Sequence, residues 1–600
     1  MGRVRVWIAG VVLGAFALPV APAAAAPPTA FNPVVEAQNF SITQQRQAVY
    51  DTPEYQAELS ADSLQSTIDG QVAAAADPER NFTTDLCWNH GNGCAGDIRL
   101  NGWGANGYGI VRPVLFTARD GATLSGHVWA TVAGPAKRPG VVITNGSVQA
   151  DEQMYWYAAQ TLAKAGYVVL TFDPQGQGMS DTFGAGADRN EGFPAQSDGR
   201  PFYDGTADAI DFFLSTPAHP YEPVRSCSTG TSHTDKQNRR VKEGLDAAYN
   251  PFWQLLSPSE LGIAGHSYGA AGVSYIGQWD PRVKAIVAWD DLGGPGPNDA
   301  PVPGAAPGAP SQTIGEQGCP ADPAARTTAP LHAPALGMSA DYGLPPAPNT
   351  QLPNPDGKST WSVNYSKAGV DTGEIIVRGG SHLDFSFIPN QAFGASLRGP
   401  DMIDWYTIAW FDRYVKHSPS ADRELLTTRW LHDATEASVD PNHDGNAFSF
   451  YYYSRLDLHL SGGQKVDCED LRDGCSALSS DDRWPGTYSY VSIDTSPDAV
   501  TGPGAPLRAS SRLTACSAGS GTRVAVPRFR GRPVVRVVVF VDRRRASVFR
   551  GRSLRSVQIP GFAGGARYRV ALWEYARGRG RRVVLARRLT RMVWGCAHRR

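Results

Sequence analysis

The sequence predicts an α/β protein with a doubly wound, mostly parallel sheet, followed by a small β-sandwich-like domain. Through the middle of the chain, short, continuously apolar runs alternate with helical patterns, which is typical of buried parallel strands. A basic segment with strand-like alternation closes the chain. At 600 residues, 42% of them hydrophobic, the chain is globular and too long for a single core.

The first residues have the pattern of a secretory signal peptide. Arg3 and Arg5 precede an apolar run at 6–18, and A-x-A sites follow near 24–26. We therefore expect residues 1–26 to be removed and the protein to be secreted to the extracellular space. A single membrane anchor is the alternative, but the apolar run is short for a span. The mean hydropathy of −0.30 argues against a polytopic membrane protein.

The eight cysteines agree with an oxidising compartment, where an even number indicates disulfides. None of the spacings is CxxC, so neither a zinc site nor a thioredoxin-like site is expected. Proximity in the sequence predicts the pairs Cys87–Cys94, Cys227–Cys319, Cys468–Cys475 and Cys516–Cys596.

The predicted sheet domain covers residues 110–418 and follows an N-terminal extension at 27–109. An alternating strand at 122–134 opens it, and Gly166 is the expected C-terminal cap of its first helix. The buried strands are expected at 140–146, 167–173, 261–265, 283–291, 334–341 and 374–380, and the helices at 151–166, 204–216, after Ser267 and at 401–417.

Other segments lie within or after this domain. Two insertions, at 217–258 and at the Pro- and Gly-rich stretch 293–333, interrupt the pattern. Such loops usually lie over the strand ends, where ligands bind. A β-rich extension is expected at 419–494, a linker at 495–506 and an Arg-rich β domain at 507–600.

The formal net charge of −1 results from an uneven distribution, because the Arg-rich domain is strongly basic. From Gly502 onward there are 24 arginines, no lysine, and only Asp542 and Glu574 as acids. A segment this basic predicts a module that binds an anionic surface or polymer, or one that targets or stabilises the rest of the protein. Nucleic acid is not the expected partner, because no aromatic-interleaved RNA-binding signature appears.

A G-x-S-x-G motif lies between a predicted strand and a predicted helix, at Gly265-His266-Ser267-Tyr268-Gly269. A serine at such a strained turn needs small residues two positions before and two after it. The motif predicts Ser267 as a nucleophile. The Tyr268 N–H, at the start of the following helix, is then an oxyanion donor.

A serine hydroxyl needs a general base. His382 follows the last predicted core strand at a Gly-rich turn, where a loop brings it over the serine. His332 precedes a strand and His417 ends a helix, so both are poorer candidates. We predict His382 as the base.

The carboxylate that orients the base is expected between serine and histidine in the chain. Asp341 ends a buried strand and is the first choice. Asp290 and Asp291 end the preceding strand and are the reserve. Asp384 lies two residues from His382 and is expected to serve the loop itself.

The order Ser267, Asp341, His382 and the turn "FDPQGQGMSD" at 172–181 resemble the α/β-hydrolase superfamily over residues 110–418. Within it the chain is similar to secreted esterases, lipases, polyester hydrolases and the dienelactone-hydrolase-like group. This resemblance implies an acyl-enzyme mechanism without a metal or organic cofactor. Asn145-Gly146 stands where the family has His-Gly, and we expect the second oxyanion donor at Ser147 or Val148.

The sequence therefore predicts a secreted carboxylic-ester hydrolase acting on an ester substrate, including a lipid or polymer. A serine peptidase of the same fold and a non-catalytic adhesion module are the alternatives. Asp440, Asn442 and Asp444, followed by a glycine, have calcium-ligand spacing, but a plain turn is favoured because Tyr451 stands where an EF-hand has Glu.

Overall fold

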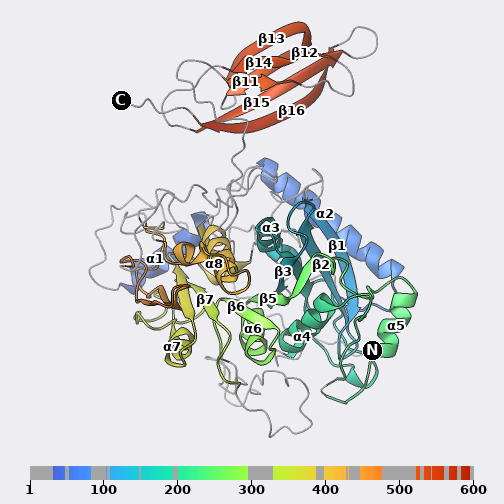
Figure 1. The fold of residues 1–600 in the computed structure, drawn as a ribbon, viewed down its shortest axis with the longest axis vertical. Helices are drawn as coiled ribbons and strands as arrows, with labels where there is room; N and C mark the ends of the chain where they lie inside the picture. The colour runs from blue at the N-terminus through green and yellow to red at the C-terminus, as the bar shows by residue number, and fades with distance from the viewer. Residues whose placement is uncertain are drawn as a thin grey trace, which may run out of the picture. The chain divides into compact units, whose positions relative to one another are not determined.

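The chain divides into two compact units, Met1–Pro506 and Leu507–Arg600 (Figure 1). The computed structural model describes residues 32–46, 53–82, 103, 109–147, 151–192, 200–226, 228–294, 329–386, 398–427, 430–431, 446–475, 522–526, 533–541, 544–559, 567–577 and 583–594. The predicted signal peptide, the linker, the calcium-like turn and six of the eight cysteines lie outside the described residues.

A ten-stranded sheet runs through the first unit in the order β1-β2-β4-β3-β5-β6-β7-β8-β9-β10. The six strands from β4 to β8 are parallel, and the strands at both edges are antiparallel. The predicted α/β class with a mostly parallel sheet is confirmed. The strands are β1 Gly109–Thr117, β2 Thr123–Thr131, β3 Arg138–Thr144, β4 Val168–Asp173, β5 Leu256–His266, β6 Val283–Trp289, β7 Ala335–Ala340, β8 Thr372–Val377, β9 Arg455–His459 and β10 Lys465–Cys468.

Helices cover both faces of this sheet. Successive side chains of a strand point to opposite faces, so Val141 and Ile143 join one apolar cluster and Val142 joins the other. Burial on both faces explains why the central strands are continuously apolar. Helices α3 (Trp156–Lys164) and α8 (Arg398–Tyr414) contribute to the first cluster, and α4 (Arg200–Leu214), α6 (Tyr268–Trp279) and α7 (Thr360–Lys367) to the second. Helix α5 (Thr234–Lys242) lies in the first predicted insertion, and α9 (Ala421–Leu425) follows α8.

Within the predicted β-rich extension at 419–494, the strands β9 and β10 pair with the main sheet. Strand β9 pairs with β8 through Thr372 and Asp457, and β10 pairs with β9. Its inward side chains Leu456 and Leu458 are buried in the same apolar cluster as α8. The sheet therefore extends beyond the predicted boundary at residue 418, because these strands complete its edge.

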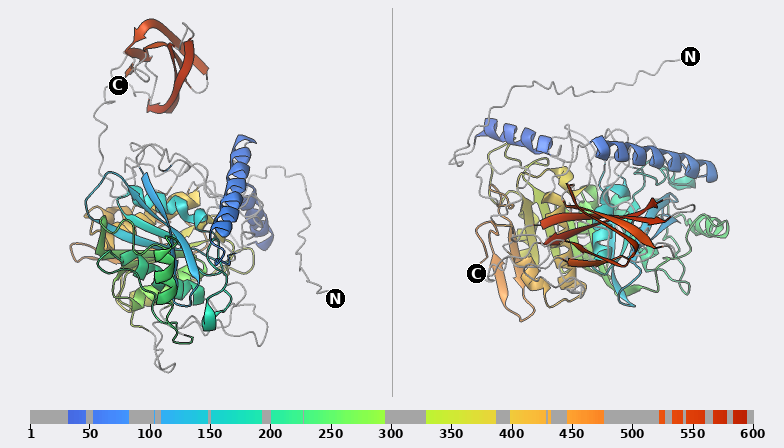
Figure 2. Two further views of the ribbon diagram at one scale, coloured as in Figure 1. Left: turned by 90° about the vertical axis from the view of Figure 1, so that its right-hand side faces the viewer. Right: turned by 90° about the horizontal axis from the view of Figure 1, so that it is seen from above.

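Two helices that the sequence did not predict, α1 (Pro33–Arg46) and α2 (Pro53–Ala76), lie along one side of the sheet domain (Figure 2). Polar contacts join them to the loop after β7, to the segment before β9 and to helix α5. Glu36 of α1 accepts a hydrogen bond from Tyr342, just after β7, at 2.5 Å, and another from Tyr451. Beyond the end of α2, Asp77 forms an ion pair of 2.6 Å with the buried Arg240.

Replacing Glu36 with alanine is expected to release α1. The substitution leaves two buried tyrosine hydroxyls and the Asn39 amide without their acceptor. We expect the free energy of opening α1 to fall by about 2–4 kcal/mol, measured by hydrogen exchange of its backbone amides. Glu243→Ala, which removes an exposed ion pair with Arg239, is the control and should change little. Unchanged protection of α1 would show that Glu36 does not hold it.

Cys468 and Cys475 lie side by side, both buried and both as free thiols. Contact with the Cys475 thiol and burial raise the pKa of the Cys468 thiol. This is the one predicted pair within the described residues, and their proximity is compatible with a bond. The four disulfides stay predictions.

The second unit holds a four-stranded antiparallel sheet, β13-β12-β15-β16, and a two-stranded one, β11-β14. Val526 and Val557, from the two-stranded part, share an apolar cluster with Val537 and Leu572 of the larger sheet. The strands are β11 Thr522–Ala525, β12 Val534–Val541, β13 Arg544–Leu554, β14 Ser556–Ile559, β15 Arg567–Arg577 and β16 Val583–Trp594. Among the described residues of either unit, no helix is long and apolar enough to cross a membrane.

Candidate active site

Ser267 occupies the sharp turn between β5 and α6, with a φ of +56°. This is a left-handed conformation that residues other than glycine rarely adopt. Among the described residues other than glycine, only Ser267, Asp290 and His417 have a positive φ. Such strain clusters at functional sites because the surrounding structure must hold it in place.

The geometry explains why the motif needs glycine on both sides of the serine. A Cβ atom on Gly265 would lie 2.3 Å from the carbonyl oxygen of Gly269. A Cβ atom on Gly269 would lie 2.3 Å from the carbonyl oxygen of Thr144, at the end of β3. Both obstacles are backbone atoms, which cannot rotate away. The two glycines therefore let β5, α6 and β3 meet at Ser267.

Replacing Gly269 with alanine is expected to destabilise the elbow. The new methyl group meets the backbone oxygens of Thr144 and Asn145, so we expect a loss of about 3 kcal/mol in stability. Thermal unfolding would measure this loss. Gly462→Ala is the matched control, because no heavy atom lies within 4 Å of its Cβ position. An unchanged unfolding temperature in Gly269→Ala would contradict the packing argument.

Two neighbouring strands bring an acid beside the serine. The Ser267 N–H donates to the carbonyl oxygen of Trp289 at 2.9 Å, so the end of β6 lies against the elbow. Asp290 follows Trp289 directly, with a φ of +46°, and its N–H donates to Met338 of β7 at 2.7 Å. Its side chain is 2% exposed, and its Oδ1 atom has no hydrogen-bond partner among the described residues.

His382 lies in the loop after β8 and meets this acid. Its Nδ1 atom is 2.7 Å from Oδ2 of Asp290. The His382 side chain is 20% exposed, so it is partly accessible to solvent. Its ring centroid is 4.5 Å from that of His266, the residue before Ser267. The predicted base and nucleophile thus both lie at the carboxyl ends of the parallel strands.

The structure does not bring Asp341, the first choice for the acid, to the imidazole of His382. Asp341 is buried at the end of β7, but its carboxylate accepts from Gly379 N–H at 2.8 Å and from the Ser449 hydroxyl at 2.5 Å. Asp341 therefore binds the start of the loop that carries His382. Asp290, one of the two reserve choices, contacts the imidazole instead. Asp291 has an exposed side chain. Asp384 accepts from Ser381 N–H in the loop, as the sequence predicted.

The two segments that carry the predicted oxyanion donors lie next to the serine. Tyr268 begins α6 directly after Ser267. The turn after β3 lies against the elbow, because a Cβ atom on Gly146 would be 3.1 Å from the Cβ atom of Ser267. The Gly146 N–H donates to the Tyr155 hydroxyl at 3.0 Å, so the next amide, that of Ser147, is the candidate donor from this turn.

The Gly-rich turn after β4 is hydrogen-bonded to the turn after β3 through Asp173. The Asp173 carboxylate accepts from the side chain of Asn145 at 2.9 Å and from Met179 N–H at 2.9 Å. Gly178 has a φ of +41°, and a Cβ atom there would lie 2.4 Å from this carboxylate. Burial, and then the charge of Glu152, raise the pKa of Asp173 to about 7. Asn145 therefore serves as a donor to Asp173.

The comparisons with known proteins add little. No family model matches the sequence, and no curated protein matches it. Among solved structures, the chain is similar to a ferulic acid esterase from Streptomyces cinnamoneus at 15% sequence identity. That match covers 57% of this chain and 95% of the esterase, with a TM-score of 0.32.

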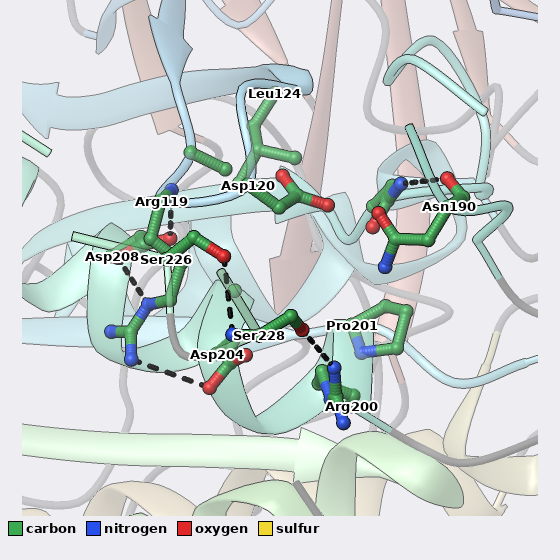
Figure 3. Close-up of a pocket in the computed structure, with 13 residues that line it drawn as sticks. Arg119, Asp120, Leu124, Asn190, Arg200, Pro201, Asp204, Asp208, Ser226 and Ser228 are labelled. Atoms are coloured by element: carbon green, nitrogen blue, oxygen red, sulfur yellow. Dashed lines mark hydrogen bonds and ion pairs between the residues drawn. The ribbon is translucent and has the colours of Figure 1, made fainter. Parts of the chain in front are cut away.

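A separate small cleft lies between the β1–β2 turn and the start of α4 (Figure 3). Arg119 occupies its wall and pairs with Asp208 at 3.0 Å and Asp204 at 3.3 Å. Neither Ser267 nor His382 lines this cleft, so it is distinct from the candidate active site. Among the described residues, no cluster of histidine, cysteine and carboxylate side chains has the arrangement of a metal site.

Proposed function

We propose that the protein is a secreted serine hydrolase that cleaves carboxylic esters through an acyl-enzyme on Ser267. One observation carries the proposal. The His382–Asp290 pair has 2.7 Å between Nδ1 and Oδ2. It lies at the carboxyl ends of the parallel strands, where Ser267 is held in a strained turn. A nucleophile, a base and an orienting acid at one site are what acyl transfer needs.

In the proposed mechanism His382 takes up a proton and then returns it, both when the acyl-enzyme forms and when water cleaves it. Asp290 accepts a hydrogen bond from the Nδ1–H of His382, which leaves the lone pair of Nε2 to act as the base. Ser267 Oγ attacks the ester carbonyl carbon as Nε2 takes its proton, and the N–H groups of Tyr268 and Ser147 stabilise the oxyanion. The intermediate collapses to the acyl-enzyme, and the alcohol leaves with the proton from His382. Water then repeats the sequence and releases the carboxylic acid.

The substrate is an ester whose acyl part reaches the strand ends around Ser267, and lipid or polymer esters belong to this class. Export through residues 1–26 would place the enzyme outside the cell with its substrate. The mechanism draws only on protein groups and water, and we propose no cofactor.

Two measurements on the mature protein test the proposal. The first is hydrolysis of p-nitrophenyl esters of increasing acyl length, which separates an esterase from a lipase. The second is the mass of the Ser267 peptide after treatment with a fluorophosphonate, which modifies only an activated serine. We expect hydrolysis and a phosphonyl adduct on Ser267. An adduct with cleavage of peptides alone would indicate a peptidase, and neither activity nor adduct would favour an adhesion module.

For the Arg-rich unit we propose an anionic polymer or surface as partner, supported by its 24 arginines against two acids. The full-length chain should be retained by an anionic polysaccharide resin at low ionic strength and released as salt rises, because exposed charges are screened. A neutral polysaccharide resin is the control. Equal retention by both resins, or retention that salt does not change, would contradict an electrostatic partner.

A further inference from the structure

A buried chain of hydrogen bonds joins three loops around Ser267. The Gly146 N–H lies 3.0 Å from the hydroxyl oxygen of Tyr155. That oxygen lies 2.8 Å from Nδ1 of His266, and Nε2 of His266 lies 2.9 Å from the carbonyl oxygen of His382. The chain thus runs from the turn after β3, through the residue before the serine, to the backbone of the predicted base.

The chemistry of the groups assigns a direction to every bond. The His382 carbonyl only accepts, so Nε2 of His266 carries a proton and donates it. Burial, together with the nearby charge of His382, lowers the pKa of His266 well below its usual value, so the ring is neutral and Nδ1 is an acceptor. Tyr155 therefore donates to Nδ1 and accepts from Gly146. Each of these polar groups has a partner in the chain.

We propose that His266 and Tyr155 are positioning residues that fix the His382 backbone and the oxyanion turn relative to Ser267. This inference rests on the proposed function. An error of about 1 Å in such a geometry lowers rates by about 10²-fold. An apolar ring at either position would fill the same space at no desolvation cost. We therefore attribute the buried hydrogen bonds to the orientation that they impose on the loops around Ser267.

Variants of His266 separate the two bonds. Glutamine keeps a donor at the position of Nε2 but loses the acceptor for Tyr155, whereas leucine removes both groups. We expect His266→Leu to lower kcat by about 10²-fold with KM within about threefold, and His266→Gln to recover at least about tenfold of that loss. Tyr155→Phe, which leaves Gly146 and His266 unpaired, should lower kcat by at least about tenfold.

Tyr167→Phe is the matched control. It also removes a buried tyrosine hydroxyl, one that donates to Asp412 at 2.6 Å, but it lies before β4 at the opposite end of the strand. All variants are compared at a temperature where circular dichroism shows them folded. A kcat within threefold of the parent in His266→Leu overturns the proposal, and so does an equal loss of kcat in Tyr167→Phe.

A second readout does not depend on catalysis. With ¹⁵N-labelled histidine, the ring of His266, assigned by its absence in His266→Gln, should be the neutral Nε2–H tautomer at about pH 6.5, where a free imidazole is half charged. A charged ring or an Nδ1–H tautomer overturns the hydrogen-bond chain even if no ester is hydrolysed. Conversely, the expected tautomer in a protein without hydrolase activity would reject the proposed function and leave the chain itself supported.

Discussion

Ser267→Ala is expected to lower kcat/KM for ester hydrolysis by at least about 10⁴-fold, the largest effect of any single substitution in this chain. The hydroxyl forms the covalent bond to the acyl group, and alanine offers no other nucleophile. The Ser267 side chain makes no hydrogen bond that caps α6, so the fold should tolerate the change. The measurement is the rate on the best p-nitrophenyl ester, together with loss of fluorophosphonate labelling.

Ser362→Ala provides the matched control for this substitution. Its hydroxyl is buried in the same domain and donates at 3.0 Å to the carbonyl oxygen of Ser359, the residue before α7. We expect its activity to stay within about twofold of the parent. Comparable rates in Ser267→Ala and the parent would remove Ser267 as the nucleophile, and the proposed mechanism with it.

Asp290→Asn is expected to have the second-largest effect, a fall in kcat of about 10³–10⁴-fold. An amide in place of the carboxylate can present an N–H to Nδ1 of His382, and it then favours the tautomer in which Nε2 carries the proton. That nitrogen can no longer accept the proton of Ser267. The amide also lacks the charge that stabilises the imidazolium formed during attack.

Asp341→Asn separates the observed partner from the one that the sequence predicted. Both residues are buried carboxylates at the ends of adjacent parallel strands, so the chemical change is the same. Asparagine at 341 would oppose one of its two donors, Gly379 N–H or the Ser449 hydroxyl, and cost about 1–3 kcal/mol of stability. We expect kcat of the folded fraction to fall by less than about tenfold. The reverse ranking, with Asp341→Asn more damaging to kcat, would restore Asp341 as the acid.

Local features of the fold were predictable because their causes are local. Gly166 ends α3 with a φ of +99°, a conformation that only glycine adopts freely, so its place in the sequence marks the end of the helix. The central strands were predictable because both of their faces are covered, which requires continuous apolar runs. The helices α1 and α2 were not, since their attachment depends on polar contacts such as Glu36 with Tyr342, about 300 residues apart in the chain.

The sequence by itself determined the mostly parallel α/β sheet, the elbow at Ser267 and the candidate base at His382. These follow from apolar runs and from glycines that must lie within a few residues of the serine. Only the tertiary structure decided that Asp290 meets His382 and Asp341 does not. Both acids end parallel strands and precede the histidine in the chain. The apolar pattern of the strands and the order of the residues therefore do not distinguish them. The choice depends on the path of the loop after β8, which brings the imidazole back over β6, and no local pattern encodes that path.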